Sequence, residues 1–302
     1  MMTDNIELSR SKLVSAADTQ IQRMVKKPSN TDEFQPLRWF YILGGQDVMS
    51  DDKMLPLTGK NMVVIGGSRG VGRRIVEAAA RNGAHLLAVA RQEGPLRQLA
   101  QEVSGADVLS LDATDEGAPS KVFDVLQPDI LVLCGGAFPP AAPLHEQSWQ
   151  EFAVNWESDV KIAFHFCKVA LSRPLLAGAS VVVISSGAAL AGSPISGGYA
   201  GAKRTQIFIA NYSQKESDRL GLGLRFMALA PRIMPDTELG KHAVAGYSRY
   251  LGLSAADFIQ SMESPPTSSD VATAVIDLVT KPDRSKGNVF IVSGKGLEAV
   301  PS

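Results

Sequence analysis

The chain has 302 residues, with 30 Lys and Arg against 31 Asp and Glu and a formal net charge of -1. This length fits one large domain and leaves little room for a second, and the balanced charge indicates neither nucleic acid nor an anionic membrane as the main partner. The longest apolar stretches, such as Leu224 to Ala230, fall far short of the ~20 residues of a membrane helix, and Met1 to Arg10 lacks the apolar core of a secretory signal. We therefore expect a soluble protein of the cytoplasm.

The first 55 residues stand apart from the rest of the chain. Several apolar residues there recur at helical spacing, up to a break at Pro28. These residues are Ile6, Leu13, Ala17, Ile21 and Met24. We expect residues 1–55 to form an N-terminal extension, partly helical or disordered, ahead of one domain over residues 56–302. Such an arm would clasp a neighbouring subunit, cover the core or stay disordered, and the sequence does not choose.

From about Lys60 onward, short apolar runs alternate with helical patterns, which is typical of a parallel sheet covered by helices. Seven runs are predicted strands: Asn61 to Ile65, Ala84 to Ala90, Ala106 to Leu111, Asp129 to Leu133, Ser180 to Ser185, Leu224 to Ala228 and Asn288 to Val292. The predicted fold is therefore α/β, a doubly wound, parallel, seven-stranded Rossmann sheet with helices on both faces.

Helical patterns fill the segments between these strands. Val71, Ile75 and Ala79 recur every four residues after the first strand, and Asn82-Gly83 ends that helix. The other predicted helices are Ser120 to Leu126, Ser148 to Ser172, Tyr199 to Arg219 and Ser268 to Thr280.

One long connection, residues 232–266, follows the sixth strand and has weak internal structure by pattern. A long excursion after a strand's carboxyl end is where a substrate lid belongs in an open sheet, so we expect a lid there. The alternative is a solvated loop with one short helix.

A glycine-rich turn follows the first strand directly. Gly66, Gly70 and Gly72 form the spacing G-x-x-x-G-x-G between a predicted strand and a predicted helix. Glycines there let the backbone turn tightly and approach a pyrophosphate, whose charge then lies at the amino end of the helix. Turns also use glycine for ordinary reasons, so the placement of this one is what indicates a dinucleotide.

Arg91 ends the second strand, about 20 residues beyond the glycines, where an NAD enzyme usually has an acidic residue for the ribose 2'-hydroxyl. Arg69, within the turn, supplies a second cation. Two guanidinium groups suit a 2'-phosphate by charge and geometry, so the sequence predicts NADP(H) rather than NAD(H). The alternative is that Arg91 is a solvated residue at a helix start, paired with Glu93.

Ser186 lies just after the fifth predicted strand, Tyr199 comes thirteen positions later, and Lys203 lies four beyond it. Positions i and i+4 share a helix face, so the Lys203 ammonium should lie beside the Tyr199 phenol. We expect its charge to lower the pKa of that phenol from the ordinary value of about 10. This spacing is common on protein surfaces, and it gains meaning here from the other motifs.

Together these motifs resemble the short-chain dehydrogenase/reductase family, in its short single-domain form, from about Pro56 to Leu297. The matching pieces are residues 66–72, Asp112, Val154-Asn155-Trp156, Ile184-Ser185-Ser186, Tyr199-Ala200-Gly201-Ala202-Lys203 and Ala230-Pro231. Their joint order and spacing are specific to that family.

The resemblance implies roles for particular residues. Tyr199 would be the general acid/base, Ser186 would steady the substrate oxygen, and Lys203 would hold the nicotinamide ribose and tune Tyr199. Asn155 would keep a water in a proton relay through Lys203, and Asp112 would meet the adenine. The implied cofactor-binding set is Gly66, Ser68, Arg69, Gly70, Val71, Gly72, Arg91, Asp112, Ala113, Gly135, Tyr199, Lys203, Pro231 and Ile233.

Some segments depart from the family pattern. Leu133-Cys134-Gly135-Gly136 stands where the family usually has Asn-Asn-Ala-Gly, so polar ties between strands are lost and the adenosine-side wall is expected to be looser. Pro231-Arg232 replaces the usual Pro-Gly, and Thr237 falls one position late. Arg232 near the nicotinamide carboxamide would alter cofactor binding or reach an anionic substrate.

The sequence thus predicts an NADP(H)-dependent ketoreductase or alcohol dehydrogenase for a small carbonyl or alcohol substrate, assembled as a dimer or tetramer. The four histidines have no metal-ligand spacing, and both Cys134 and Cys167 are predicted to be buried, free thiols. We expect no metal, nucleic-acid or membrane partner. One alternative is a non-catalytic scaffold that keeps the cofactor fold. A nucleotide-sugar epimerase of the extended form is disfavoured by the glycine spacing and the short C-terminal portion.

Overall fold

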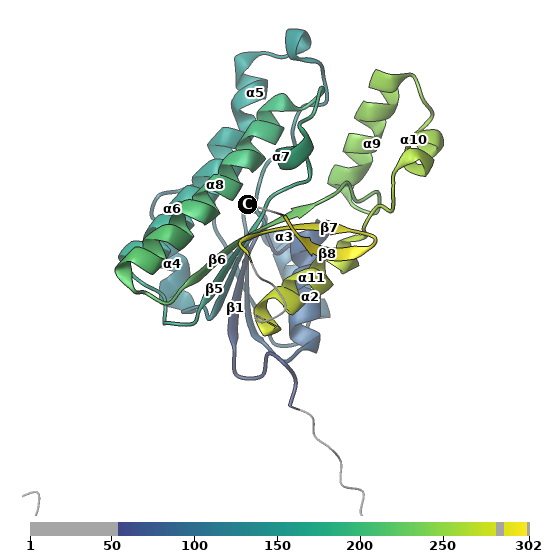
Figure 1. Cartoon of the computed structure of the whole chain (residues 1–302). Coiled ribbons are helices and arrows are strands. Elements are labelled where there is room, and N and C mark those ends of the chain that lie inside the picture. The colour runs from purple at the N-terminus through teal and green to yellow at the C-terminus, as the bar shows by residue number, and fades with distance from the viewer. Residues whose placement is uncertain (1–53, 282–286, 301–302) are drawn as a thin grey trace, which may run out of the picture. The chain divides into compact units, whose positions relative to one another are not determined.

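An eight-stranded sheet runs through the part of the chain that the computed structural model describes, residues 54–281 and 287–300 (Figure 1). Its order is β3-β2-β1-β4-β5-β6-β7-β8, and all neighbours are parallel except β7 and β8. The strands are β1 (Asn61–Ile65), β2 (His85–Ala90), β3 (Ala106–Ser110), β4 (Ile130–Leu133), β5 (Ser180–Ile184), β6 (Arg225–Pro231), β7 (Val289–Ser293) and β8 (Gly296–Ala299). The predicted fold class is confirmed, with one antiparallel edge strand more than the seven predicted. The predicted N-terminal extension lies almost wholly outside the described residues.

Helices cover both faces of the sheet. The long ones are α2 (Gly70–Arg81), α3 (Glu93–Glu102), α4 (Ala118–Val125), α6 (Lys161–Ser172), α8 (Gly197–Leu220) and α11 (Ser268–Thr280). Shorter ones are η1 (Leu144–Glu146), α5 (Trp149–Asn155), the π-helix η2 (Trp156–Val160) and α7 (Ala188–Ala191). None of the described helices is long and apolar enough to span a membrane. The helix α3 was not predicted, and the predicted helix over residues 148–172 is divided by the π-helix.

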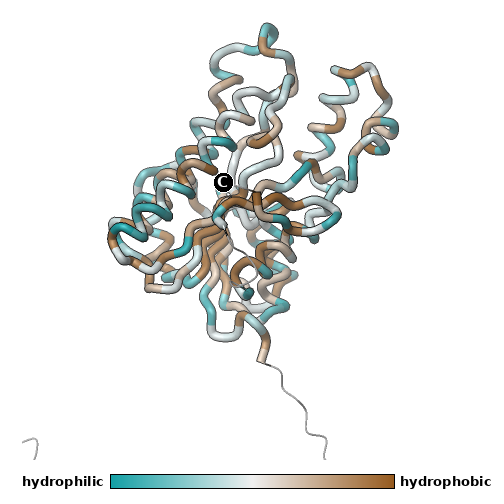
Figure 2. The backbone as a smooth tube through the Cα atoms, viewed as in Figure 1, coloured by the Kyte–Doolittle hydropathy of each residue, from teal (hydrophilic) through white to brown (hydrophobic). Residues whose placement is uncertain are grey.

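Alternate residues of β1 enter two separate hydrophobic cores, as the two-residue period of a strand requires. Met62 and Val64 pack with α2, α3 and α11, whereas Val63 and Ile65 pack with α4, α6 and α8. Figure 2 shows the apolar colour concentrated along the strands. Because both faces are buried, the strands are continuous apolar runs rather than alternating ones.

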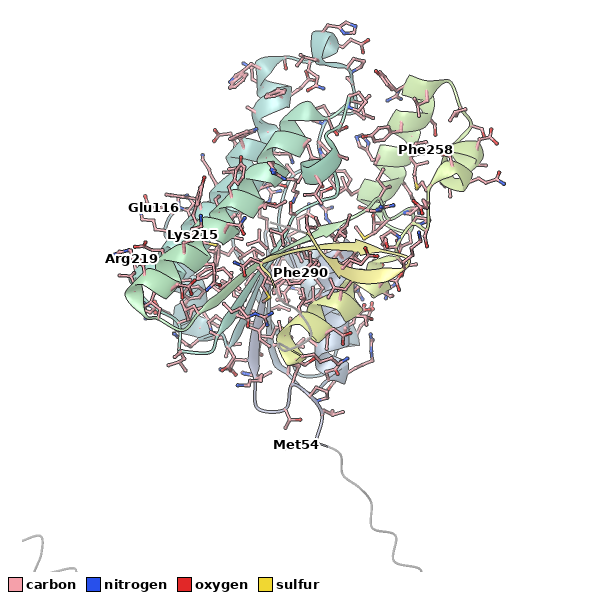
Figure 3. The ribbon with its side chains drawn as sticks, viewed as in Figure 1. Met54, Glu116, Lys215, Arg219, Phe258 and Phe290 are labelled. Carbon is pink, nitrogen blue, oxygen red and sulfur yellow. The ribbon has the colours of Figure 1, made fainter. Side chains whose placement is uncertain are left out.

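The connection after β6 is more regular than its pattern predicted. It contains α9 (Glu238–Leu251) and α10 (Ala255–Ser261), each begun by a side-chain cap, from Thr237 and Ser254. In Figure 1 these two helices stand beyond the carboxyl edge of the sheet, across from α5 and α7. Figure 3 shows Phe258 on α10 far from Phe290 in the sheet. The segment is therefore a helical hairpin, and the expected weak structure is wrong.

Candidate active site

The glycine-rich turn joins β1 to α2 and has no room for larger side chains. Gly66 has a φ of +81°, and a Cβ there would lie 2.7 Å from the backbone nitrogen of Gly135. A Cβ on Gly72 would lie 2.1 Å from the carbonyl oxygen of Gly66. No side chain caps the start of α2 at Arg69, so the first backbone N–H groups of this helix are available to an anion. The turn fits the pyrophosphate of a dinucleotide.

A cavity of about 1120 Å³ opens at the carboxyl edge of the sheet, beside this turn. The predicted cofactor residues all line it: Gly66, Ser68, Arg69, Gly70, Val71, Gly72, Arg91, Asp112, Ala113, Gly135, Tyr199, Lys203, Pro231 and Ile233. The sheet order reverses between β1 and β4, and open α/β sheets bind their ligands at such a switch point. The volume exceeds that of a typical small-ligand site, about 300–1000 Å³, so a dinucleotide and a small substrate have room together.

Two exposed arginines lie at the wall of the cavity formed by the ends of β1 and β2. The Arg69 guanidinium lies 5.6 Å from the centre of the Phe138 ring, a cation–π distance. Arg91 lines the same cavity. The alternative pairing of Arg91 with Glu93 is not what the structure has, because Glu93 Oε1 binds Arg97 Nη2 at 2.6 Å. Both cations therefore line the cavity beside the glycine-rich turn.

Asp112 lies in the same region, after β3. Its Oδ1 accepts hydrogen bonds from the Thr114 backbone N–H at 3.0 Å and from the Thr114 hydroxyl at 2.8 Å. The backbone bond, helped by the hydroxyl and the nearby charge of Arg91, holds the pKa of Asp112 below its ordinary value although burial opposes this. The carboxylate is thus fixed in its charged form at the cavity wall.

Ser186, Tyr199 and Lys203 meet at one wall of the cavity. Ser186 follows β5, and the other two lie in the first turns of α8, so the predicted shared face of Tyr199 and Lys203 is on a helix. Lys203 Nζ lies 5.5 Å from the centre of the Tyr199 ring and donates a 3.1 Å hydrogen bond to the Ile184 carbonyl. A phenol, a hydroxyl and an ammonium thus line the same part of the cavity.

The pKa of Tyr199 departs from its ordinary value in the direction opposite to the sequence-based expectation. Burial raises the pKa of this phenol, and the Lys203 charge and a hydrogen bond with Ser186 lower it only in part. The expected lowering below about 10 is therefore wrong for this structure. The neighbourhood therefore keeps the Tyr199 phenol protonated at neutral pH.

Asp159, which the sequence did not single out, is the closest charged partner of Lys203. Asp159 Oδ2 lies 3.0 Å from Lys203 Nζ, and only 2% of the Asp159 side chain is exposed. Burial opposes the charge of Lys203, but Asp159 and Tyr199 outweigh it and raise the pKa of the lysine above its ordinary value. Lys203 therefore stays an ammonium at neutral pH.

Asn155 lies behind Asp159 and does not line the cavity. Its Nδ2 donates to the Ala137 carbonyl at 2.8 Å and to Asp159 Oδ1 at 3.2 Å. Asn155 is fully buried, and its Oδ1 has no protein partner. The expected relay through Asn155 thus has Asp159 standing between the amide and the lysine.

A signal for Asp159 was present in the sequence. It lies four positions after Asn155, so a helix places both on one face, and it interrupts the otherwise apolar face that includes Ile162 and Ala163. A carboxylate on an apolar helix face is rarely buried unless it is paired.

On the side of the hairpin, the cavity is lined by α9 and by residues that follow α10, among them His242, Tyr247 and Met262. The Tyr247 hydroxyl donates a 2.7 Å hydrogen bond to Ser193 Oγ, and His242 Nε2 lies 3.0 Å from the Pro139 carbonyl oxygen. The Tyr247 ring also stacks on Phe258 at 5.4 Å. These contacts hold the hairpin against the side of the molecule that carries Tyr199.

Two of the departures from the family pattern have a definite place here. Arg232 lines the cavity, and its Nη1 lies 4.0 Å from Glu263 Oε2. The positive charge of Arg232 is therefore partly matched by Glu263, although Glu263 also binds Lys295 at 2.6 Å. The Thr237 hydroxyl caps α9 by accepting from the Gly240 N–H at 2.9 Å.

The other departure places a thiol in the cavity wall. Cys134 is half-buried and lines the cavity, whereas Cys167 is fully buried, and both are free. Burial raises the pKa of the Cys134 thiol to about 11, so it is neutral at ordinary pH. Cys134 is thus not the plain core residue that was predicted.

Comparison with known proteins points to one family. The model for the short chain dehydrogenase family matches residues 60–248. A short chain dehydrogenase/reductase of Aspergillus aculeatus is 26% identical over 193 residues, 61% of this chain and 67% of that protein. An L-fucose dehydrogenase of Rattus norvegicus is 31% identical over 134 residues, 43% of this chain and 50% of that protein.

Two further similarities differ in reach. A glycine betaine reductase of Emericella nidulans is 29% identical over 250 residues, which is 78% of this chain but 19% of that protein. The chain thus spans from a fifth to two thirds of these three relatives. A solved structure from Brucella melitensis, described as a short-chain dehydrogenase/reductase of the glucose/ribitol dehydrogenase type, has a TM-score of 0.68. It is 20% identical and covers 80% of this chain and 97% of its own, so it shows the fold.

Proposed function

The chain belongs to the short-chain dehydrogenase/reductase family, and from this premise we propose that it transfers a hydride between NADP(H) and the carbon of a small carbonyl or alcohol substrate. The observation that carries the proposal is the convergence of Ser186, Tyr199 and Lys203 on the cavity that the glycine-rich turn also lines. The chemistry has a proton donor and a cation side by side, as the reduction of a carbonyl requires.

The nicotinamide, when bound, supplies or accepts the hydride. In reduction, the chain's own residues act on the carbonyl oxygen of the substrate, which gains negative charge as its carbon is reduced. The Tyr199 hydroxyl donates its proton to that oxygen, and the Ser186 hydroxyl donates a hydrogen bond that steadies it. In oxidation the same phenol oxygen takes the proton back from the alcohol. Lys203 keeps a positive charge beside this exchange and has donors for a ribose hydroxyl.

The preference for NADP(H) rests on Arg69 and Arg91. Both line the cavity at the wall formed by the ends of β1 and β2, and among the described residues neither has a carboxylate within ion-pair distance. Guanidinium groups that no carboxylate occupies are suited to a phosphate on the adenosine ribose.

We also propose that the chain assembles as a dimer or tetramer through α5, α6 and α8. Large apolar side chains are exposed on these helices and on the adjoining η2: Trp149, Trp156, Phe164, Phe208 and Tyr212. Scattered apolar residues are normal on a surface, but a group of aromatic residues on neighbouring helices is typical of an interface. Sedimentation velocity would measure the assembly.

The proposed activity is tested by following cofactor oxidation with NADPH across a panel of ketones and aldehydes. Any substrate found is then offered to Tyr199→Phe, with Tyr250→Phe, an exposed tyrosine of α9 outside the cavity lining, as the matched control. Turnover by the parent and by Tyr250→Phe, with loss in Tyr199→Phe, supports the proposal. Equal rates in Tyr199→Phe would refute the catalytic role. NADPH binding without any turnover would favour a non-catalytic scaffold instead.

A further inference from the structure

We propose that Asp159 is a positioning residue for this reaction, because its carboxylate is the fixed counter-ion of the Lys203 ammonium and withholds part of that charge from the Tyr199 hydroxyl. The inference rests on the proposed function, since it assigns to Tyr199 the proton donor's part. Its consequence is a phenol that keeps its proton to higher pH, which favours carbonyl reduction over alcohol oxidation.

The carboxylate is held in one place by bonds to both of its oxygens. Asp159 Oδ1 accepts from the Ala137 backbone N–H at 3.0 Å, from the Ser158 hydroxyl at 2.7 Å and from Asn155 Nδ2 at 3.2 Å. Asp159 Oδ2 is left for Lys203 Nζ at 3.0 Å. These contacts fix the position of the buried carboxylate beside Lys203, as expected of a charged group that is buried only when paired.

The backbone around Asp159 is shaped to bring it to α8. Asp159 lies in the π-helix η2 between α5 and α6, and such wide turns are frequent at functional sites. Its backbone carbonyl accepts a 2.9 Å hydrogen bond from Gln206 Nε2 on α8. Asp159 is thus joined to α8 twice, through Gln206 and through Lys203.

The opposite side of the carboxylate needs a glycine. A Cβ on Gly136 would lie 2.6 Å from Asp159 Oδ2 and 2.7 Å from Oδ1. The space that a side chain at residue 136 would occupy is therefore filled by the carboxylate.

Lys203 is directed by these contacts. A lysine ammonium has three N–H donors. One lies toward Asp159 and one is donated to the Ile184 carbonyl at 3.1 Å. The third remains for the phenol oxygen or a ribose hydroxyl. Loss of Asp159 would leave the ammonium with its full charge and only the Ile184 carbonyl to orient it.

Titratable groups act on the Tyr199 phenol from three elements. Lys203 on α8 lowers its pKa, whereas Asp159 on η2 and Cys134 after β4 raise it, and burial raises it most. Cys134 has a pKa of about 11 and carries no charge at neutral pH. Of these groups Asp159 is therefore the one whose negative charge opposes Lys203 under working conditions.

The test replaces Asp159 with the neutral isostere Asp159→Asn. The control is Glu157→Gln, which removes an exposed carboxylate of the same π-helix that pairs with Lys161 at 2.5 Å. Two readouts are followed: the pH profile of kcat/KM for carbonyl reduction, and the titration of Tyr199 by NMR of ¹³Cζ-labelled tyrosine, assigned with Tyr199→Phe. The NMR titration needs no turnover.

In Asp159→Asn we expect the basic limb of the kcat/KM profile and the midpoint of the Tyr199 titration to move to lower pH by about one pH unit or more. In Glu157→Gln we expect both to remain where they are in the parent. The inference is overturned if the Tyr199 titration does not move in Asp159→Asn. It is also overturned if that titration moves to higher pH because Lys203 has lost its proton. If the inference is overturned but the parent still turns over substrate, the proposed function stands without a role for Asp159. Absence of turnover in the parent would sink the proposed function while the NMR titration still decides the charge effect.

Two measurements keep the inference testable if Asp159→Asn does not fold. Gly136→Ala forces the carboxylate away from its seat, so it should move the Tyr199 titration in the same direction by less. In the parent chain, we expect Tyr199 to titrate above the ordinary value of about 10. A parent value at or below that would overturn the inference by itself.

Discussion

The hydroxyl of Tyr247 on α9 donates a 2.7 Å hydrogen bond to the Oγ of Ser193, which lies between α7 and α8. This bond joins the helical hairpin α9–α10 to the segment that leads into α8 and Tyr199. The hairpin therefore has a polar attachment to the side of the cavity that carries Tyr199, in addition to its packing.

Tyr247→Phe should loosen this wall without removing the stacked ring. A neutral hydrogen bond contributes about 1 kcal/mol, which corresponds to roughly a fivefold change in an equilibrium. We expect KM for the substrate to rise by about that factor with kcat nearly unchanged, measured by steady-state kinetics. Tyr250→Phe, an exposed residue of the same helix, is the control. An unchanged KM in Tyr247→Phe would show that the bond does not hold the substrate wall.

Gly72→Ala should weaken cofactor binding. The added Cβ would lie 2.1 Å from the Gly66 carbonyl oxygen, so the turn has to open. We expect NADPH affinity to fall by more than about tenfold and the melting temperature to fall with it, because overpacking typically costs about 1–3 kcal/mol. Gly94→Ala has open space at its Cβ and should leave binding intact. Tight NADPH binding by Gly72→Ala would contradict the assignment of the turn.

The two arginines at the cavity wall should decide the cofactor. We expect NADPH to bind at least about tenfold tighter than NADH, a difference of about 1.4 kcal/mol or more, measured by fluorescence titration. Arg91→Ala and Arg69→Ala should each reduce this ratio by weakening NADPH alone. Arg97→Ala, which breaks the exposed pair with Glu93, is the matched control. Equal affinities in the parent would reject the NADP(H) preference.

Ser186, Tyr199 and Lys203 should fail in different ways. Tyr199→Phe should lower kcat by about 10²–10⁴ with NADPH affinity within a few-fold, because only the transferred proton is removed. Ser186→Ala should cost less, about 10², since the proton donor remains. Lys203→Met should damage both rate and cofactor affinity. It should also destabilise the fold by about 3–5 kcal/mol, because it leaves the Asp159 carboxylate buried and unpaired.

Chemical denaturation of each variant separates a loss of stability from a loss of rate or cofactor affinity. If Lys203→Met unfolds at the same denaturant concentration as the parent, Asp159 does not depend on its partner for its buried place. Should Ser186→Ala be as inactive as Tyr199→Phe, the hydroxyl of Ser186 would have to take part in the proton transfer itself.

Alkaline pH should weaken the fold through Lys203. Its pKa is raised in the folded chain because Asp159 and Tyr199 outweigh the burial that opposes its charge. A group with a raised folded pKa contributes stability that is present below its unfolded value, about 10.4, and is lost as the pH rises through the folded value. We expect the free energy of unfolding to fall above about pH 10, by about 1.36 kcal/mol for each pH unit that separates the two values.

Denaturant unfolding across this range measures the slope. Tyr199, whose pKa burial raises, contributes in the same direction. Lys215→Met on the exposed face of α8 is the control and should keep the slope, whereas Asp159→Asn should reduce it. A parent stability that is constant up to pH 11 would contradict the raised lysine pKa.

Much of this molecule is readable along the chain because its causes are local. The strand β1 and the turn at Gly66 follow from an apolar run and a glycine spacing, and the pair of Tyr199 and Lys203 follows from four positions on one helix. The helix α3 escaped the prediction although Glu93 and Arg97 form the i, i+4 pair of an ordinary exposed helix. Its two buried residues, Leu96 and Leu99, give a short apolar pattern.

The strand β8 and the hairpin α9–α10 were beyond local reasoning. The four residues of β8 have no clear apolar pattern, and the strand forms because it pairs with β7, in which Phe290 is opposite Ala299. The segment of α9 carries polar residues at many positions, and its inward face becomes evident only from the cavity it lines. Tertiary contacts supplied the partners that the pattern lacked.

By itself the sequence determined the family, the fold class and the glycine-turn, Ser186, Tyr199 and Lys203 part of the cavity lining, because spacing within one strand, turn or helix is enough to place these residues. The tertiary structure alone decided how those residues are charged. Asp159 contacts Lys203 because a π-helix packs against α8. The pKa of the Tyr199 phenol is raised because the surrounding elements bury it. Burial and charge pairing depend on groups far apart in the chain, so no local pattern contains them.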